Sequence, residues 1–152
     1  MIKLLFVCHG NICRSPMAEF IMKDIVRQHH REQDFLIESA ATSSEELGRP
    51  VYPPARRLLQ QHGISCDGKT ALQFRPSDYD RYDMIILMDH NNLRNIKRIV
   101  PNDFDNKYSL LLDYTSSPGG IADPWYTNDF EKAYAEIYRG CVGLYEYLKT
   151  ST

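Results

Sequence analysis

The chain has little of what marks exported, membrane-spanning or nucleic-acid-binding proteins. Its N-terminal apolar run, from Ile2 to Val7, is about half a dozen residues long, which is too short for a signal peptide or a membrane helix. The formal net charge is -2, which gives no reason to expect a nucleic-acid partner. The sequence therefore predicts a cytoplasmic protein without membrane contact.

Cysteine is also scarce, with four residues at positions 8, 13, 66 and 141. In a chain of this length without an export signal, they predict reduced thiols rather than a disulfide framework. We expect Cys66 and Cys141 to fill small apolar spaces. Cys8, His9 and Cys13 lack a fourth ligand for zinc, so no metal and no cofactor is predicted.

Strand-like and helix-like segments alternate along the 152 residues, and no linker or repeat interrupts them, so we expect one domain over residues 1–152. The candidate strands lie at about residues 2–8, 35–41, 83–88 and 107–112. This alternation favours an α/β fold with a parallel sheet, right-handed crossovers and helices on both faces. The basic residues Arg94, Lys97 and Arg98 have helical spacing, and we interpret them as a solvated helix face.

The last helical pattern is the clearest, because its apolar residues recur at three- and four-residue spacing. We interpret this stripe as core packing, and its members are Phe130, Ala133, Tyr134, Ile137, Cys141, Leu144, Tyr145 and Leu148.

The segment from Val7 to Pro16 joins the first strand to a helical pattern, and its composition suits an anion. The first amides of a helix lack intrahelical partners and carry the positive end of the helix dipole, so they stabilise a phosphate. Gly10 permits positive φ and a close backbone approach, and Asn11 tolerates the left-handed region. We expect successive amides here to form an anion-binding concavity, with Pro16 in the first helical turn.

Two side chains in this loop suit phosphoryl transfer. The positive field that holds an anion also favours the thiolate of Cys8, which makes it a nucleophile. Arg14 offers a planar fork of donors that matches two phosphoryl oxygens and holds them more strongly in the transition state. The Ser15 hydroxyl either caps the helix or donates to the Cys8 sulfur.

A thiolate that attacks a phosphate monoester also needs a proton donor for the leaving oxygen. Asp123 lies in a loop after the fourth candidate strand, where Pro124 stiffens the chain and Trp125 and Tyr126 offer flat apolar surface. From the residues alone, Asp-Pro is also a common turn, so the acid role stays open. Asp89 is the rival acid, but we interpret it as the cap of a helix that starts near His90.

The string from Val7 to Pro16, V-C-x-G-N-x-C-R-S-P, together with the distal Asp123-Pro124-Trp125-Tyr126, resembles the signature of the low molecular weight protein tyrosine phosphatases. The resemblance implies a four-stranded parallel sheet and hydrolysis of phosphotyrosine through a phosphocysteine, with Cys8, Arg14 and Asp123 as catalytic residues. It implies phosphotyrosine proteins or small aryl phosphates as substrates of a redox-sensitive monomer. The implied substrate-binding residues are His9, Gly10, Asn11, Ile12, Cys13, Ser15, Glu45, Trp125 and Tyr126, with Ser39 as structural support.

Several positions depart from the commoner pattern of that family. Glu45 stands where many relatives carry an aromatic wall of the cleft, and His9 replaces a residue that is often apolar. Gly68-Lys69-Thr70-Ala71 stands where many relatives have His-x-Ala-Arg, so we expect Asn11, Ser15 and Ser39 to carry the support of the loop alone. Cys13 is either a small buried residue or a partner for Cys8 in a protective disulfide.

Three alternatives remain open from the sequence. Arsenate reductases resemble this loop but carry further cysteines near the third strand, and residues 81–95 contain none. Phosphoarginine phosphatases of the family carry threonine at the position of Ile12, and an isoleucine there favours the flat ring of phosphotyrosine. A phosphate-binding module without turnover would have no need for Cys8, Arg14 and Asp123 together.

Overall fold

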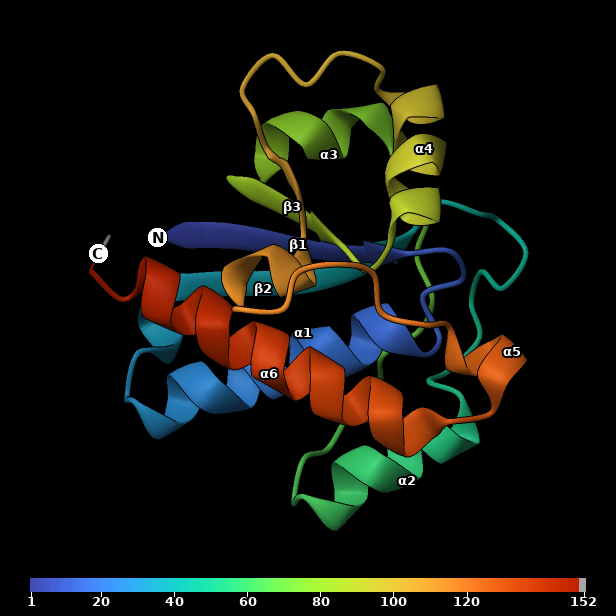
Figure 1. Cartoon of the computed structure of the whole chain (residues 1–152), viewed down its shortest axis with the longest axis vertical. Helices are drawn as coiled ribbons and strands as arrows, with labels where there is room; N and C mark the ends of the chain where they lie inside the picture. The colour runs from blue at the N-terminus through green and yellow to red at the C-terminus, as the bar shows by residue number, and fades with distance from the viewer. Residues whose placement is uncertain (151–152) are drawn as a thin grey trace.

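The computed structural model describes residues 1–150, so the last two residues of the predicted domain lie outside the described part. Four parallel strands form one sheet in the order β2-β1-β3-β4 (Figure 1). The strands are β1 (Ile2–Cys8), β2 (Phe35–Ala41), β3 (Met84–Leu87) and β4 (Tyr108–Leu110). The predicted α/β fold with a four-stranded parallel sheet is confirmed.

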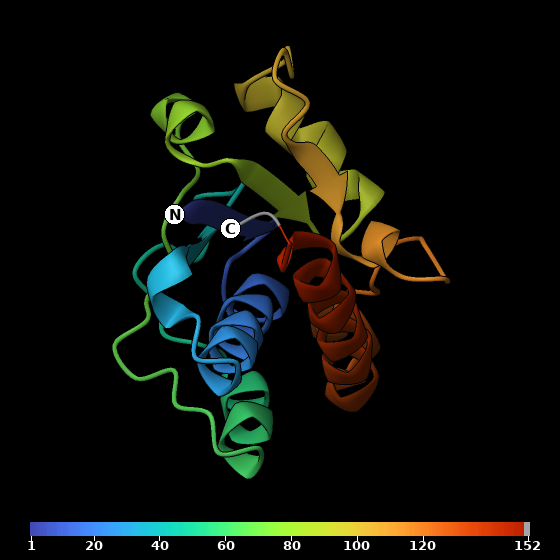
Figure 2. The same cartoon turned by 90° about the vertical axis from the view of Figure 1, so that its left-hand side faces the viewer.

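Helices cover both faces of this sheet, as predicted (Figures 1 and 2). One face carries α1 (Arg14–Gln28), α2 (Pro53–Gln61) and α6 (Phe130–Leu148), and the other carries α3 (Pro76–Arg81) and α4 (His90–Ile99). Short elements complete the chain: the 3-10 turns η1 (Glu32–Asp34) and η2 (Leu111–Tyr114), and the helix α5 (Pro124–Thr127).

The alternation of side chains along β1 supplies both layers of the core. Leu4 and Phe6 pack into the larger apolar cluster with α1 and α6, whereas Leu5 and Val7 pack into the smaller one beneath α3 and α4. A strand buried on both faces is continuously apolar, which is why the N-terminal run is a central strand.

The predicted C-terminal helix is confirmed as α6, and every member of its predicted apolar stripe is buried. Two glycines let α6 approach the segment after β4. A Cβ added at Gly140 would lie 2.5 Å from Leu111 Cγ, and one added at Gly143 would lie 2.0 Å from the Tyr114 carbonyl oxygen. The close packing of α6 on η2 therefore requires these glycines.

The fourth strand is shorter than predicted, because residues 111 and 112 turn into η2 instead of extending β4. Asp113 accepts a hydrogen bond from the Leu110 amide at 2.9 Å, which closes the turn. The turn places Leu111 and Leu112 in the core, in the cluster that contains the α6 stripe. Their apolar run was misread as strand, since a short buried 3-10 turn has the same hydrophobic pattern.

The chain order places a gap between helices at the carboxyl end of the sheet. The connection after β1 leads to α1 on one face, whereas the connection after β3 leads to α4 on the other. Ligands of open parallel sheets bind at such switch points. Among the described residues, no helix combines the length and the apolar character needed to cross a membrane.

Candidate active site

The loop between β1 and α1 folds around the Cys8 sulfur. Asn11 has a φ of 59°, so it occupies the left-handed region as predicted. Gly10 does not have a positive φ, and that expectation was wrong. Its role is the close approach, since a Cβ there would lie 3.3 Å from Glu46 Cγ. The turn aims the Asn11 amide at Cys8 Sγ, with 3.4 Å from nitrogen to sulfur.

The start of α1 lies beneath the sulfur rather than being capped by a side chain. Cys13 is the N-cap residue and makes no side-chain capping bond. Ser15 does not cap the helix, so the first of its two predicted roles is wrong. Its Oγ lies 3.0 Å from Cys8 Sγ, as the second role requires. Pro16 stands in the first turn, as predicted.

Arg14 is buried, with 2% of its side chain exposed, and acidic groups hold its guanidinium in place. Nη1 donates to Asp89 Oδ2 and to the Ile121 carbonyl, both at 2.6 Å, and Nη2 lies 3.4 Å from Asp123 Oδ2. Burial opposes the charge, but the neighbouring anions outweigh it and raise the pKa of Arg14. The donors on Nε and Nη2 stay available for an anion.

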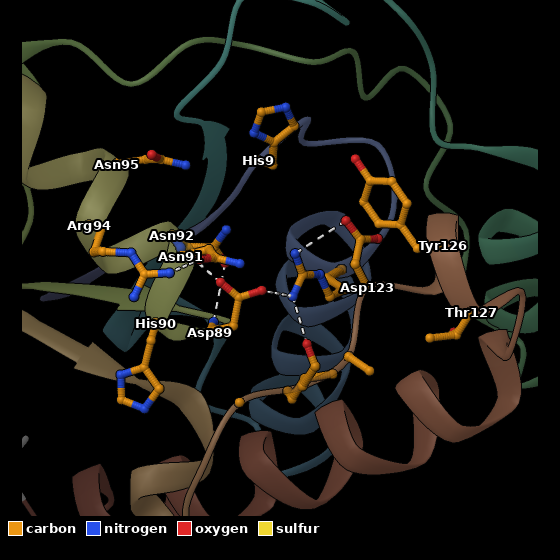
Figure 3. Close-up of a pocket in the computed structure, with 14 residues that line it drawn as sticks. His9, Asp89, His90, Asn91, Asn92, Arg94, Asn95, Asp123, Tyr126 and Thr127 are labelled. Atoms are coloured by element: carbon orange, nitrogen blue, oxygen red, sulfur yellow. Dashed lines mark hydrogen bonds and ion pairs between the residues drawn. The ribbon is translucent and has the colours of Figure 1, made fainter.

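Asp89 and Asp123 each begin a helix as well as facing Arg14. Asp89 Oδ1 accepts from the Asn92 amide at 2.8 Å, which confirms that Asp89 caps α4. Asp123 Oδ1 accepts from the Trp125 amide at 3.0 Å and caps α5. Figure 3 shows the two carboxylates on either side of the guanidinium, each joined to it by a dashed line. The Asp-Pro pair therefore begins a short helix instead of forming a simple turn, and Asp123 also lies at the site.

The loop before α5 reaches the site because the end of β3 anchors it. The Ile121 amide donates to the Met88 carbonyl at 2.8 Å, and Gly120 passes Asp89 so closely that an added Cβ would lie 3.1 Å from Asp89 Cβ. Trp125 and Tyr126 were expected in a loop, but they lie in α5.

A cavity of about 150 Å³ opens over the Cys8 sulfur and brings the predicted residues together. Its lining comprises Cys8, His9, Gly10, Asn11, Ile12, Cys13, Arg14, Glu45, Glu46, Asp123, Trp125 and Tyr126. Ser15 and Ser39 do not line it but lie beneath it. Glu46 was missed, because only the contact with Gly10 distinguishes it from its neighbour Glu45 in the sequence.

A second cavity, of about 680 Å³, adjoins the first and lies between α4 and the Asp123 loop (Figure 3). The two cavities share His9, Arg14, Asp123 and Tyr126. Arg94, Lys97 and Arg98 are all exposed on α4, so the predicted solvated helix face is confirmed. Arg94 also lines this second cavity and contacts Asn91.

Nearly the whole chain, and not only this site, matches a known protein family. The family model described as low molecular weight phosphotyrosine protein phosphatase matches residues 3–152. The chain belongs to this family. A relative, the low molecular weight protein-tyrosine-phosphatase PtpA of Staphylococcus aureus, is 37% identical over 148 residues, which cover 97% of this chain and 94% of that protein.

Solved structures agree with the assignment to the phosphatase family. YfkJ from Bacillus subtilis superposes with a TM-score of 0.96 at 34% identity, covering 100% of this chain and 97% of that one. SP-PTP, a low molecular weight protein tyrosine phosphatase from Streptococcus pyogenes, superposes with a TM-score of 0.88 at 41% identity. The match covers 97% of this chain and 93% of that one. The protein is a phosphatase of this type, and the comparisons do not favour the arsenate-reductase or phosphoarginine-phosphatase alternatives.

Acidic and aromatic side chains both line the phosphatase cleft. Glu45 is one of the acidic residues, and its Oε2 lies 3.4 Å from His9 Nε2. Trp125 and Tyr126 are 48% and 81% exposed, and the Trp125 ring packs against Tyr52 with 4.9 Å between centroids. His9 lies at the rim of this cleft, with 42% of its side chain exposed, and it contacts Glu45.

The support beneath the phosphatase loop is larger than predicted. Asn11 Nδ2 donates to Ser15 Oγ at 2.7 Å and to Ser39 Oγ at 2.9 Å, as the sequence suggested. These three residues do not carry the network alone, however. Ser39 Oγ donates to Glu19 Oε1 at 2.5 Å, and Lys69 Nζ donates to the Ser39 carbonyl at 2.9 Å. Within the segment that departs from the family pattern, Lys69 therefore contributes to the support of the loop.

The remaining cysteines fill apolar space, as expected. Cys66 and Cys141 are buried members of the larger core cluster, and all four cysteines are free thiols. Burial raises the pKa of both thiols. Within residues 1–150, no group of three or more histidine, cysteine, aspartate or glutamate side chains is placed to hold a metal ion.

Proposed function

We propose that Cys8, Arg14 and Asp123 carry out phosphotyrosine hydrolysis in two steps. In the first step, the Cys8 thiolate attacks phosphorus, and a sulfur–phosphorus bond forms as the bond from phosphorus to the tyrosine oxygen breaks. The Asp123 carboxylic acid protonates that leaving oxygen. The products of this step are tyrosine and a phosphocysteine.

In the second step, the Asp123 carboxylate accepts a proton from a water molecule, whose oxygen attacks phosphorus. The sulfur–phosphorus bond breaks, inorganic phosphate forms, and the Cys8 thiolate and the Asp123 acid are regenerated. The free donors of Arg14 and the loop amides hold the equatorial oxygens through both steps. The observation that carries this proposal is the cavity of about 150 Å³, which all three side chains line.

The lining of this cavity supports an aromatic substrate. Ile12 contributes an aliphatic side chain to the lining, and Trp125 contributes a flat aromatic ring. A phosphotyrosine ring gains apolar contact with both, whereas a phosphoarginine guanidinium is strongly polar and gains less. We therefore propose that His9, Gly10, Asn11, Cys13, Glu45 and Tyr126 complete a site for phosphotyrosine proteins or small aryl phosphates.

The decisive experiment compares substrates and variants side by side. Wild type, Cys8→Ser and Asp123→Ala are assayed on phosphotyrosine, phosphoserine and phosphoarginine peptides and on arsenate. We expect wild type to turn over phosphotyrosine, Cys8→Ser to be inactive, and Asp123→Ala to lose about 10²–10⁴ in kcat. Asp129→Ala is the matched control, because Asp129 caps α6 and does not line the cavity.

No turnover of phosphotyrosine by wild type, or full activity of Cys8→Ser, would overturn the proposal. Faster turnover of phosphoarginine than of phosphotyrosine would overturn the substrate assignment but leave the nucleophile in place.

We also propose that the enzyme acts in the cytoplasm as a monomer. The free, buried state of all four cysteines supports a reducing compartment. The three proposed catalytic side chains come from one chain, so the proposed reaction requires no second copy. Light scattering of the purified protein tests the oligomeric state, and a dimer at assay concentration would contradict it.

A further inference from the structure

A continuous series of hydrogen bonds runs from a buried carboxylate to the Cys8 sulfur. Glu19 Oε1 contacts Ser39 Oγ at 2.5 Å, and Ser39 Oγ contacts Asn11 Nδ2 at 2.9 Å. The same Asn11 nitrogen contacts Ser15 Oγ at 2.7 Å, and Ser15 Oγ lies 3.0 Å from Cys8 Sγ. All five residues are buried.

The chemistry of the groups gives this series a direction. An ionised carboxylate only accepts, so Ser39 uses its proton on Glu19 and accepts from Asn11. The Asn11 amide is held in one orientation, because its Oδ1 accepts from the Leu72 amide at 3.1 Å. Its two N–H groups therefore donate to Ser39 and Ser15. Ser15 keeps its own proton free, and that proton points to Cys8.

A buried carboxylate stays ionised only when cations accompany it, because burial favours the neutral form. Two lysines reach Glu19: Lys23 Nζ lies 2.6 Å from Oε2, and Lys69 Nζ lies 3.6 Å from Oε1. The Lys23 side chain is 44% exposed, whereas Lys69 is 9% exposed and Glu19 is 5% exposed. Lys69 is thus the interior partner, and it also donates to the Ser39 carbonyl.

We propose that Lys69 is a positioning residue for the Cys8 nucleophile, because its ammonium pairs with the Glu19 carboxylate that accepts from Ser39 and thereby directs the Ser15 proton onto the sulfur. The proposal rests on the proposed function, in which Cys8 attacks as a thiolate. Ser15 donating to a thiolate stabilises it, whereas Ser15 accepting from a thiol would not. The stabilised sulfur is also the leaving group when the phosphocysteine is hydrolysed.

The charged groups that face Cys8 stay the same in the test variants, which change only residues at the far end of the series. Cys8 faces Arg14, Asp123 and Cys13. Lys69 faces Glu19, Lys23 and Glu38, and burial lowers its pKa while Glu19 opposes that shift. A change at residue 69 or 19 therefore reports on this series rather than on Arg14.

The experiment measures the rate at which iodoacetamide alkylates Cys8 as a function of pH, with the Cys8 adduct quantified by mass spectrometry. Lys69→Met keeps the aliphatic stem and removes the ammonium. We expect the midpoint of the alkylation profile to rise by about half to one pH unit, the size of one lost charge-assisted contact. The acid limb of the kcat/KM profile should move with it, and Lys69→Arg should restore both.

Glu19→Gln distinguishes the direction of the hydrogen-bond series from a simple charge effect on Cys8. Removing a negative charge favours a thiolate by Coulomb's law, so charge alone predicts a lower midpoint. The proposal predicts a higher one, because a neutral amide no longer fixes Ser39 as the donor. Lys23→Met should have a smaller effect than Lys69→Met, since Lys69 stays in place. Lys97→Met, on the exposed face of α4, is the matched control and should change nothing.

A Lys69→Met enzyme that loses thermal stability but keeps the wild-type midpoint would overturn the proposal, because that is the result of a purely structural role. A lowered midpoint in Glu19→Gln would overturn it as well. If Lys69→Met does not fold, the midpoint of Glu19→Gln alone tests the proposal. Alkylation needs no turnover, so these outcomes are distinct from failure of the proposed function, which the Cys8→Ser assay reports.

Discussion

At the scale of single residues, Cys8 and Cys13 share one small cavity but differ in environment. Cys8 accepts the Asn11 amide and faces Ser15, both of which suit a thiolate. Burial raises the pKa of the Cys13 thiol, and the nearby Cys8 and Asp123 charges add to this shift. Cys13 is therefore a thiol at neutral pH and does not compete with Cys8 for substrate.

This difference predicts a role for Cys13 during oxidation. We expect peroxide to convert Cys8 to a sulfenic acid and the Cys13 thiol to condense with it, giving a disulfide and water. We expect wild type to regain most of its activity with dithiothreitol, whereas Cys13→Ser proceeds to the sulfinic acid and stays inactive. Activity recovery and the mass of the Cys8 peptide measure this. Cys66→Ser is the control, and equal recovery of Cys13→Ser would leave Cys13 as a small core residue.

At the scale of elements, Asp103 ties α3 and β4 to the segment between α4 and β4. Its Oδ1 accepts from Tyr79 Oη at 2.5 Å and from the Lys107 amide at 2.7 Å, and its Oδ2 accepts from the Tyr108 amide at 3.0 Å. Burial alone would raise the pKa of Asp103, but these hydrogen bonds outweigh it and lower the pKa. The ionised form therefore stabilises the fold.

The sign of that shift sets the pH dependence. The stabilisation is fully present above the unfolded value, near 3.9 for aspartate, and is lost as pH falls through the lower folded value. We expect Asp103→Asn to lower the urea midpoint at neutral pH, and the difference from wild type to shrink as pH falls below the unfolded value. Asp105→Asn, an exposed neighbour, is the control. A difference that stays constant with pH would contradict the assignment.

At the scale of the whole molecule, the cavity exists only when the loop after β1, residues 45 and 46 after β2, and the segment before α6 meet. A ligand that needs this assembly binds the folded state and raises Tm. We expect vanadate, which resembles the transferring phosphoryl group, to inhibit wild type and to raise its Tm, and we expect a chelator to change neither activity nor stability.

Cys8→Ser should show a much smaller Tm rise with vanadate, whereas Cys66→Ser should keep the wild-type rise. A divalent-metal requirement in the purified enzyme would contradict the proposed mechanism.

Some features of the chain could be predicted because their cause is local. The β1 strand, the left-handed Asn11, the cap at Asp89 and the stripe of α6 each follow from neighbouring residues. Other features depended on distant contacts and were missed or misjudged. Leu111 and Leu112 were assigned to a strand, because only their packing with α6 distinguishes a buried 3-10 turn from a strand.

The sequence by itself determined the loop from Val7 to Pro16, the order of strands and helices, and the family, because motif spacing and hydrophobic period are local properties of the chain. Tertiary structure decided how distant charges are paired. Asp89 is 75 residues from Arg14, and Ser39 is 20 residues from Glu19, yet each pair is in hydrogen-bond contact. Burial makes such contacts obligatory, since a buried charge without a partner costs far more free energy than an exposed one. Folding therefore brings Lys69 and Glu19 to the hydrogen-bond series that ends at Cys8. No local pattern in the sequence shows this arrangement.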